Sequence, residues 1–128
     1  MVRNRFFQIL RVIRFDDKTT RNQQRSIDKL APIRCVFESI ISIFQMAYTP
    51  NEHTTIDEQL VVFRGKCPFH VFIKSKPGKY GMKLWVAADA KNFYACSMQV
   101  YAGKSGGVRE KKQDLQVIKD MVCHMYGT

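Results

Sequence analysis

Long apolar runs are missing from this 128-residue sequence. The longest stretch without a charged residue covers residues 39–51, and a membrane span needs roughly 20 apolar residues. A signal peptide is not visible either, because Arg3, Arg5, Arg11 and Arg14 interrupt the apolar positions near the start. Since 45% of the residues are hydrophobic and 25% are charged, the composition indicates a globular chain with no membrane partner.

Closely spaced cysteines are also absent. The four cysteines contain no CxxC pair: Cys35, Cys67, Cys96 and Cys123. We therefore expect reduced, mostly buried thiols instead of disulfides or a metal site, which fits the cytosol or the nucleus. The three histidines have no spacing typical of metal ligands either: His53, His70 and His124.

Basic side chains are missing from one part of an otherwise basic chain of net charge +10. Residues 35–63 have no Lys or Arg but carry four acids, Glu38, Glu52, Asp57 and Glu58. Residues 1–34 carry nine basic and three acidic side chains, and residues 64–104 carry eight basic and one acidic. This order suits an enzyme that cuts nucleic acid with metal ions, because basic flanks bind phosphates and carboxylates bind the cation. A generally basic protein with one acidic strand gives the same pattern.

Helical spacing predicts helices at the two ends of the chain. Residues Phe6, Ile9, Leu10 and Ile13 form one helical face, and residues 21–26 are predicted to be a polar linker. A second helix is expected to start near Asp28 as N-cap, with Pro32 in its first turn, and to end at Thr49. Residues 108–126 predict a last helix after a loop at 103–107. Its expected apolar face is Leu115, Ile118, Met121, Val122 and Met125.

The middle of the chain predicts strands. Residues 54–63 are short, β-branched and apolar, and residues 70–74 suit a second short strand. Residues 76–79 read as a turn. Residues 82–88 and 94–102 are joined by residues 89–92, which predicts a hairpin.

Several sequence blocks resemble the piggyBac transposase family. Residues 55–69 read TIDEQLVVFRGKCPF, residues 75–86 read SKPGKYGMKLWV, and residues 100–104 read VYAGK. Upstream, residues 28–34 read DKLAPIR and residues 48–50 read YTP. Each block alone is weak, but together they cover nearly the whole chain.

The resemblance implies an α+β fold and a division into two domains. Residues 1–53 would be a helical segment, part of the dimerisation and DNA-binding domain. Residues 54–128 would be an incomplete RNase H-like catalytic core, with its first three strands and first helix. Implied partners are DNA and a second copy of the chain, by self-association or a family-like dimer. The implied location is the nucleus.

Asp57 matches the first of three catalytic aspartates of the family, which hold two divalent ions, Mg²⁺ or Mn²⁺. The ions activate a water or a DNA 3′ hydroxyl for attack on a phosphodiester. From the residues alone, a solvent-facing Asp on an edge strand is the alternative. Basic residues flanking this strand are candidates for phosphate contacts, each with a solvated surface role as its alternative: Arg64, Lys66, Lys74, Lys76, Lys79 and Lys83.

The neighbouring polar and aromatic residues receive structural roles. Glu58 should face the opposite side of the strand from Asp57 and form a salt bridge, because side chains alternate along a strand. Asp89 is expected to bond its own backbone in the hairpin turn. Trp85 is expected in the core, with base stacking as a lesser option.

The second and third aspartates of the family have no counterpart in the sequence, which stops just before the strand expected to carry the second. The chain is therefore expected to be a transposase fragment or remnant, enzymatic only in a longer form. The alternative is a non-catalytic DNA-binding or interaction module.

Overall fold

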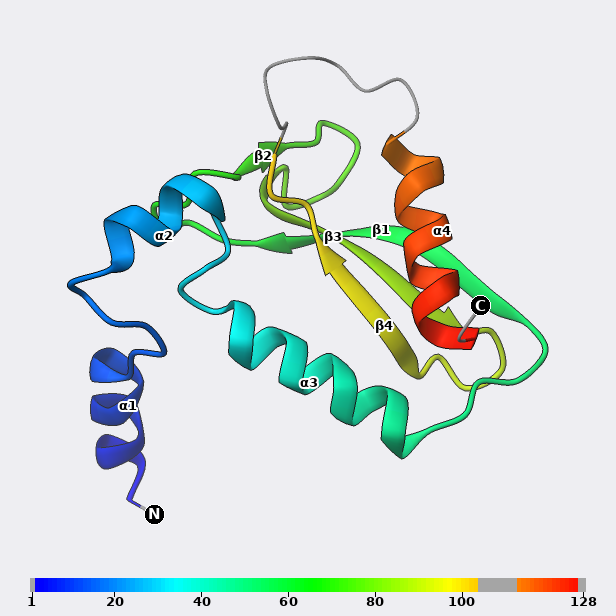
Figure 1. The fold of residues 1–128 in the computed structure, drawn as a ribbon, viewed down its shortest axis with the longest axis horizontal. Coiled ribbons are helices and arrows are strands. Elements are labelled where there is room, and N and C mark those ends of the chain that lie inside the picture. The colour runs from blue at the N-terminus through cyan, green and yellow to red at the C-terminus, as the bar shows by residue number, and fades with distance from the viewer. Residues whose placement is uncertain (1, 104–112, 127–128) are drawn as a thin grey trace. The chain divides into compact units, whose positions relative to one another are not determined.

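A computed structural model describes residues 2–103 and 113–126 (Figure 1). Helices and antiparallel strands follow one another, as the predicted α+β class requires. In order they are α1 (Arg3–Val12), α2 (Arg21–Ile27), α3 (Arg34–Ala47), β1 (Thr54–Val62), β2 (Val71–Phe72), β3 (Tyr80–Asp89), β4 (Ala95–Val100) and α4 (Gln113–Tyr126). None of the helices in the described part is long and apolar enough to cross a membrane.

The chain divides into two compact units, residues 1–38 and 39–128. The boundary predicted between residues 53 and 54 is a different one: it separates the helical segment from the catalytic core of the family, and it stays a prediction. Residues 104–107 of the loop predicted at 103–107, and the helix start predicted at 108, lie outside the described residues.

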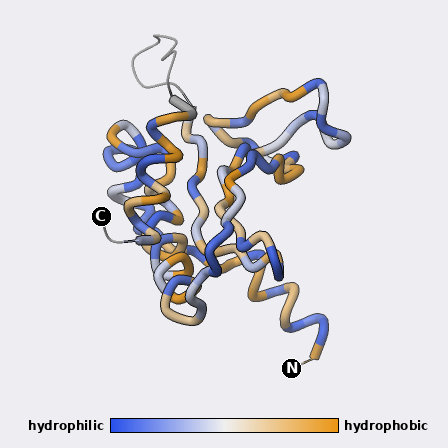
Figure 2. The backbone as a smooth tube through the Cα atoms, turned by 90° about the vertical axis from the view of Figure 1, so that its right-hand side faces the viewer, coloured by the Kyte–Doolittle hydropathy of each residue, from blue (hydrophilic) through white to orange (hydrophobic). Residues whose placement is uncertain are grey.

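In the first unit, α1 confirms the predicted first helix. Its tube in Figure 2 alternates between hydrophilic and hydrophobic residues. The predicted apolar face is present, but its side chains are exposed: Phe6, Ile9, Leu10 and Ile13.

The predicted linker at 21–26 was wrong, because these residues form α2. Arg and Gln favour helices despite their polarity. The guanidinium of Arg21, the first residue of α2, also donates two hydrogen bonds to the carboxylate of Asp16, at 2.5 and 2.9 Å. A polar stretch is therefore not by itself a linker.

The predicted start of the second helix was also wrong. Asp28 ends α2, since its N–H donates to the carbonyl of Gln24, and α3 begins only at Arg34. The Asp28 carboxylate accepts the N–H of Leu30 at 2.9 Å and pairs with the Arg34 guanidinium. These contacts hold residues 28–33 as a turn, because an Asp side chain bonded to its own backbone competes with helix formation.

The second unit contains one antiparallel sheet in which β3 lies between its neighbours (Figure 1). Along one edge β3 pairs with the whole of β1, from Thr54 opposite Asp89 to Val62 opposite Gly81. Along its other edge it pairs with β2 and with β4. The predicted strands and hairpin are confirmed.

Gly81 allows β1 and β3 to approach each other. It is buried, and a Cβ at this position would lie 2.1 Å from the carbonyl oxygen of Val61. Any side chain here would push the two strands apart at the end of their ladder.

Helix α4 packs on the sheet. Val117 and Met121 are buried with Ala87 of β3, and Ile56, Trp85 and Met125 pack against this cluster. The core position predicted for Trp85 is confirmed. The predicted apolar face of α4 was partly wrong, because Leu115, Ile118 and Val122 are exposed. The helix contacts the sheet along the row 117, 121 and 125, whose spacing of four residues repeats on one side of a helix.

Candidate functional site

The two neighbouring acids of β1 lie on opposite faces of the sheet. Ile56 belongs to the face covered by α4, so Glu58, two residues further along the strand, lies on that same face. Asp57 lies on the other face, opposite Val86 of β3, and is exposed. The predicted alternation is confirmed.

The Asp57 carboxylate has few interactions with other protein groups. Its Oδ1 accepts the N–H of Glu58 at 2.7 Å. Within residues 2–103 and 113–126, no Lys or Arg forms an ion pair with it. The carboxylate is therefore available to a cation from solution, because most of its lone pairs are free of protein donors.

Glu58, in contrast, is neutralised within the protein. Its Oε2 lies 2.7 Å from Nζ of Lys83, and both side chains are largely covered. The same Nζ lies 4.4 Å from the centre of the Trp85 ring, which adds a cation–π contact. The predicted salt bridge of Glu58 is confirmed.

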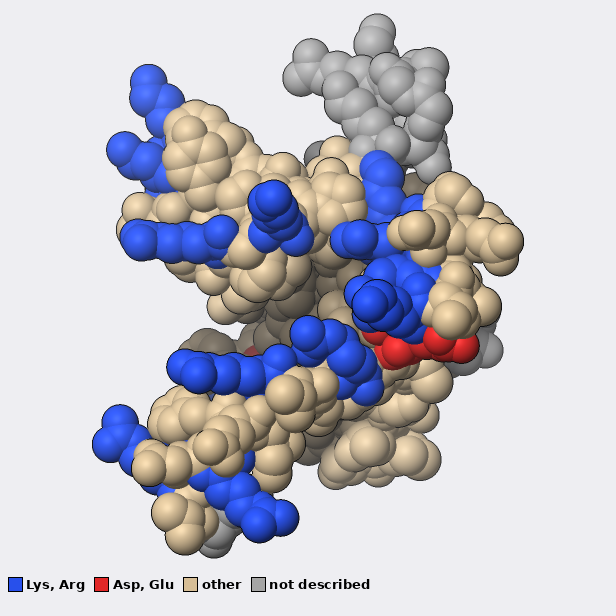
Figure 3. All heavy atoms as spheres, turned by 90° about the vertical axis from the view of Figure 1, so that its left-hand side faces the viewer, with Lys and Arg blue, Asp and Glu red and all other residues tan. Residues whose placement is uncertain are grey.

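The six basic candidates for DNA contact separate into two groups. Lys83 pairs with Glu58, and Nζ of Lys76 donates to the Glu58 carbonyl at 3.1 Å. The other four are exposed and lie between the end of β1 and the start of β3: Arg64, Lys66, Lys74 and Lys79. On the face drawn in Figure 3, Lys and Arg cover far more of the surface than Asp and Glu do.

Asp89 is a second carboxylate, at the end of β3, and it is fully buried. Its Oδ1 accepts the N–H groups of Lys91 and Asn92, which confirms the predicted turn role. Its Oδ2 accepts the Tyr48 hydroxyl at 3.0 Å and both the N–H and the Nδ2 of Asn51, at 2.7 and 2.8 Å. The Asn51 N–H above all holds the pKa of Asp89 well below its ordinary value, even though burial acts in the opposite direction.

Sequence reasoning missed this longer-range role of Asp89. The carboxylate joins the segment before β1 to the β3–β4 turn, and Ala90 reinforces the junction by donating its N–H to the His53 carbonyl at 3.0 Å. Tyr48 belongs to the YTP block, so the signal was present as a motif, but its partner some forty residues away was not readable from spacing.

A complete metal centre does not form from the residues that the structure describes. Within them, no three His, Cys, Asp or Glu side chains gather closely enough to hold an ion. Asp57 provides one carboxylate, whereas a two-ion site needs several converging on the same place. No disulfide joins the four cysteines. The expectation that these thiols are mostly buried was wrong, because Cys96 is buried but Cys35 and Cys123 are exposed.

Comparison with known families shows to which family the chain belongs. The model of a family described as Transposase IS4 matches residues 1–127. The chain belongs to this family. Its piggyBac type, predicted from the motifs, is confirmed by the relatives and the solved structure that follow.

Two curated human proteins match 88% of this transposase-family chain. PiggyBac transposable element-derived protein 3 of Homo sapiens is 28% identical over 113 residues, which are 18% of its own length. The Chimeric ERCC6-PGBD3 protein of Homo sapiens is likewise 28% identical over 113 residues, or 10% of its length. The chain thus spans about a fifth or less of the curated relatives it matches.

A solved structure, titled as a cryo-EM structure of piggyBac transposase synaptic complex with hairpin DNA, matches 98% of the chain with a TM-score of 0.85 and 34% identity. The chain covers 26% of that protein. This similarity confirms the predicted RNase H-like fold, here its first strands and helix. The chain is transposase-derived.

Proposed function

We propose that residues 54–128 are the opening part of a piggyBac-type catalytic core, with Asp57 as one ligand of a divalent ion, Mg²⁺ or Mn²⁺, and that residues 1–53 belong to the dimerisation and DNA-binding segment before it. The contrast between the two acids of β1 carries the proposal. Glu58 is covered and paired with Lys83, whereas Asp57 is exposed and has no ion pair in the described ranges. An exposed carboxylate with free lone pairs, in a β-rich segment that has basic residues on both sides, is well suited to a cation.

DNA is the proposed partner. Four exposed cations follow Asp57 along the chain, and a solved relative is named as a complex with hairpin DNA. Lysine and arginine side chains release counterions when they contact phosphates, so their contribution depends on salt. With reduced thiols and DNA as ligand, the nucleus is the location we propose.

A non-catalytic DNA-binding module is the second candidate. It is favoured because, among the described residues, no group of three His, Cys, Asp or Glu side chains forms around Asp57, and one carboxylate alone binds Mg²⁺ poorly when the ion requires six well-placed oxygens. Both candidates bind DNA, and they differ in whether an ion at Asp57 supports cleavage.

Ion binding at Asp57 is tested by NMR. Mn²⁺ added to the ¹⁵N-labelled chain should broaden the amide signals of residues around Asp57 at millimolar concentrations. Asp57→Asn should abolish the broadening, and the matched control Glu58→Gln should keep it. Broadening centred elsewhere, or unchanged in Asp57→Asn, would refute the proposed ligand.

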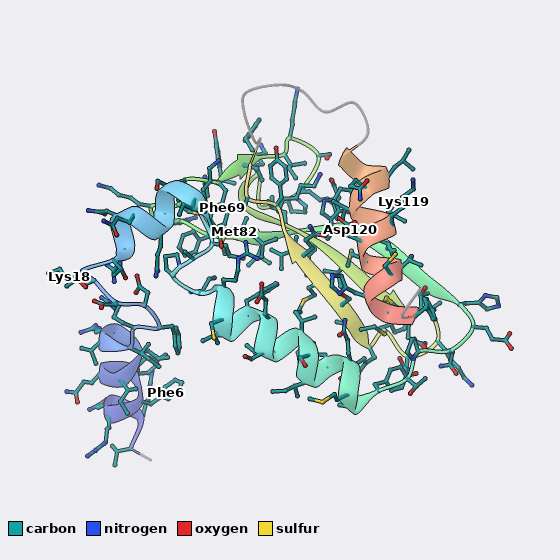
Figure 4. The ribbon with its side chains drawn as sticks, viewed as in Figure 1. Phe6, Lys18, Phe69, Met82, Lys119 and Asp120 are labelled. Carbon is teal, nitrogen blue, oxygen red and sulfur yellow. The ribbon has the colours of Figure 1, made fainter. Side chains whose placement is uncertain are left out.

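DNA binding is tested by fluorescence anisotropy with a labelled duplex over a salt series. Affinity should fall steeply as salt rises, and the double variant Lys74→Gln, Lys79→Gln should reduce the slope of log K against log salt by about 2. The control Lys91→Gln, Lys119→Gln removes the same charge from the β3–β4 turn and from α4, where Lys119 is labelled in Figure 4. Equal effects of the two variants would mean that these four lysines act only through total charge.

Catalysis is tested with a terminal-repeat duplex and Mg²⁺ or Mn²⁺. We expect the 128-residue chain by itself neither to nick nor to join DNA. Nicking that disappears in Asp57→Ala would refute this expectation and favour the first candidate over the second.

A further inference from the structure

Three aromatic side chains lie together and exposed in the same stretch of chain as the exposed Lys74 and Lys79. Tyr80 opens β3 and pairs with Phe72 of β2, and their ring centres are 4.7 Å apart. The His70 ring is stacked with Tyr80, with centres 6.0 Å apart and planes only 7° from parallel. Phe72 and Tyr80 are 55% and 56% exposed. We call His70, Phe72 and Tyr80 the aromatic surface.

The backbone holds these rings in place before any ligand arrives. The N–H of Ile73 donates to the Lys79 carbonyl at 2.8 Å and closes the loop between β2 and β3. Lys79 itself has a left-handed backbone, with φ of 51°. The His70 ring contacts the Phe63 carbonyl, and buried Phe69, labelled in Figure 4, anchors the segment that leads into β2. A fixed surface loses less entropy on binding than a mobile one.

The stretch of chain that carries the aromatic surface has charge of one sign. Residues 59–88 contain no Asp or Glu but six Lys and Arg. Lys74 follows Phe72 by two residues, Lys79 directly precedes Tyr80, and both are exposed. A ligand that covers the rings would therefore also meet cations, which favours a polyanion over an apolar protein surface.

We propose that the aromatic surface binds single-stranded DNA, with unpaired bases stacking on Tyr80 and Phe72 while Lys74 and Lys79 contact the phosphates. This inference rests on the proposed function, because it assumes DNA as the partner, and it names the form of DNA bound here. Exposed aromatic rings within a basic surface suit unpaired bases, whose faces are free, whereas a duplex hides those faces in its stack.

The experiment compares ligands of equal charge. A labelled oligothymidylate, an abasic strand of the same length and a shorter duplex with the same number of phosphates are titrated with the full chain by anisotropy. The base-bearing strand should bind about tenfold more tightly than the abasic strand, because stacking one base on an aromatic ring increases the affinity by about this factor. A strand containing 2-aminopurine should also lose fluorescence on binding as its base stacks.

Variants assign the effect to the rings. Tyr80→Ala and Phe72→Ala should each weaken binding of the base-bearing strand about tenfold and leave duplex and abasic binding within about twofold. Tyr80→Phe keeps the ring and should keep the affinity. Phe93→Ala is the control, because Phe93 is 83% exposed but lies in the β3–β4 turn. Melting curves show whether each variant folds. The 2-aminopurine test uses the wild-type chain, so it stays informative even if a variant does not fold.

Equal affinity for base-bearing and abasic strands would overturn the inference, as would equal losses for single strand and duplex in Tyr80→Ala. Either result leaves the proposed function standing, provided that duplex binding still weakens with salt. Absence of any salt-dependent DNA binding would overturn both. Chain dimerisation lost in Tyr80→Ala, without an effect on DNA, would assign the aromatic surface to protein contacts and also overturn the inference.

Discussion

Asp57 and Asp89 are the same residue type in neighbouring strands of one sheet, and their surroundings are opposite. The side chain of Asp89 is buried and accepts hydrogen bonds from Tyr48, Asn51, Lys91 and Asn92. The side chain of Asp57 is exposed and accepts one hydrogen bond from its neighbour in the chain.

The difference separates two uses of a carboxylate. A buried charge with every lone pair occupied stabilises the fold and has no capacity left for a ligand, because any newcomer would displace an existing donor. An exposed carboxylate contributes little to stability and keeps its capacity for a cation. Position in the fold thus distinguishes a structural aspartate from a candidate catalytic one.

The largest expected effect is on the buried carboxylate. Asp89→Ala leaves the Tyr48 hydroxyl and several N–H groups without an acceptor, so the melting temperature should fall by more than about 10 °C. Circular dichroism melting measures this. A fall no larger than that of Asp57→Ala would remove the contrast between the two aspartates.

The stability of the fold should also depend on pH through the Asp89 carboxylate. The folded state holds the pKa of Asp89 below its ordinary value of 3.8, so the unfolded chain binds the proton first as pH falls. Its stabilising effect is therefore complete above about pH 5 and is lost progressively below the ordinary pKa. Melting temperatures between pH 5 and pH 2.5 should fall less steeply in Asp89→Asn than in the wild type. Asp16 and Asp28, also held at lowered pKa by Arg21 and Arg34, stay in both proteins. Equal slopes would contradict the assignment to Asp89.

The next largest effect should be on self-association, through the outer edge of β1. Within the described residues β1 pairs only with β3, and Val61, Val62 and Phe63 at its end are exposed. Unpaired apolar edges recruit other chains, so the chain should self-associate through residues 54–63, and Val62→Lys should weaken the association about tenfold. Size-exclusion chromatography with light scattering measures the mass. A monomer at all concentrations would refute this prediction.

The paired acid of β1 should have a smaller effect. Glu58→Gln removes a largely covered salt bridge to Lys83 and should cost about 0.5–1 kcal/mol of unfolding free energy. Urea unfolding measures the change, and the double variant with Lys83→Met should recover part of it. A loss in the double variant equal to the sum of the single losses would show that the two side chains do not interact.

Asp57 itself should matter least for stability. Asp57→Ala changes an exposed side chain, so the unfolding free energy should stay within about 0.5 kcal/mol of the wild type. The same variant removes the carboxylate proposed to hold a divalent ion. A large destabilisation would make Asp57 a structural residue and weaken its proposed role.

Much of the second unit could be predicted from the sequence, and less of the first. Alternation in β1 placed Asp57 and Glu58 on opposite faces, and the apolar runs of the hairpin matched β3 and β4. Residues 21–34 were misread because the Asp16–Arg21 and Asp28–Arg34 ion pairs decide where α2 and α3 begin, and composition does not reveal which charges will meet.

The sequence by itself determined the family, the alternation of side chains around Asp57 and the sign of charge along the chain, since these depend on motifs and on local periodicity. Only the tertiary structure decided which side of α4 is buried, that Asp89 joins Tyr48 and Asn51 to the hairpin, and that the rings of Tyr80 and Phe72 meet and lie exposed. These features arise when segments distant in the chain come together. Burial and the pairing of charges belong to that packing, because they depend on neighbours that sequence spacing does not specify.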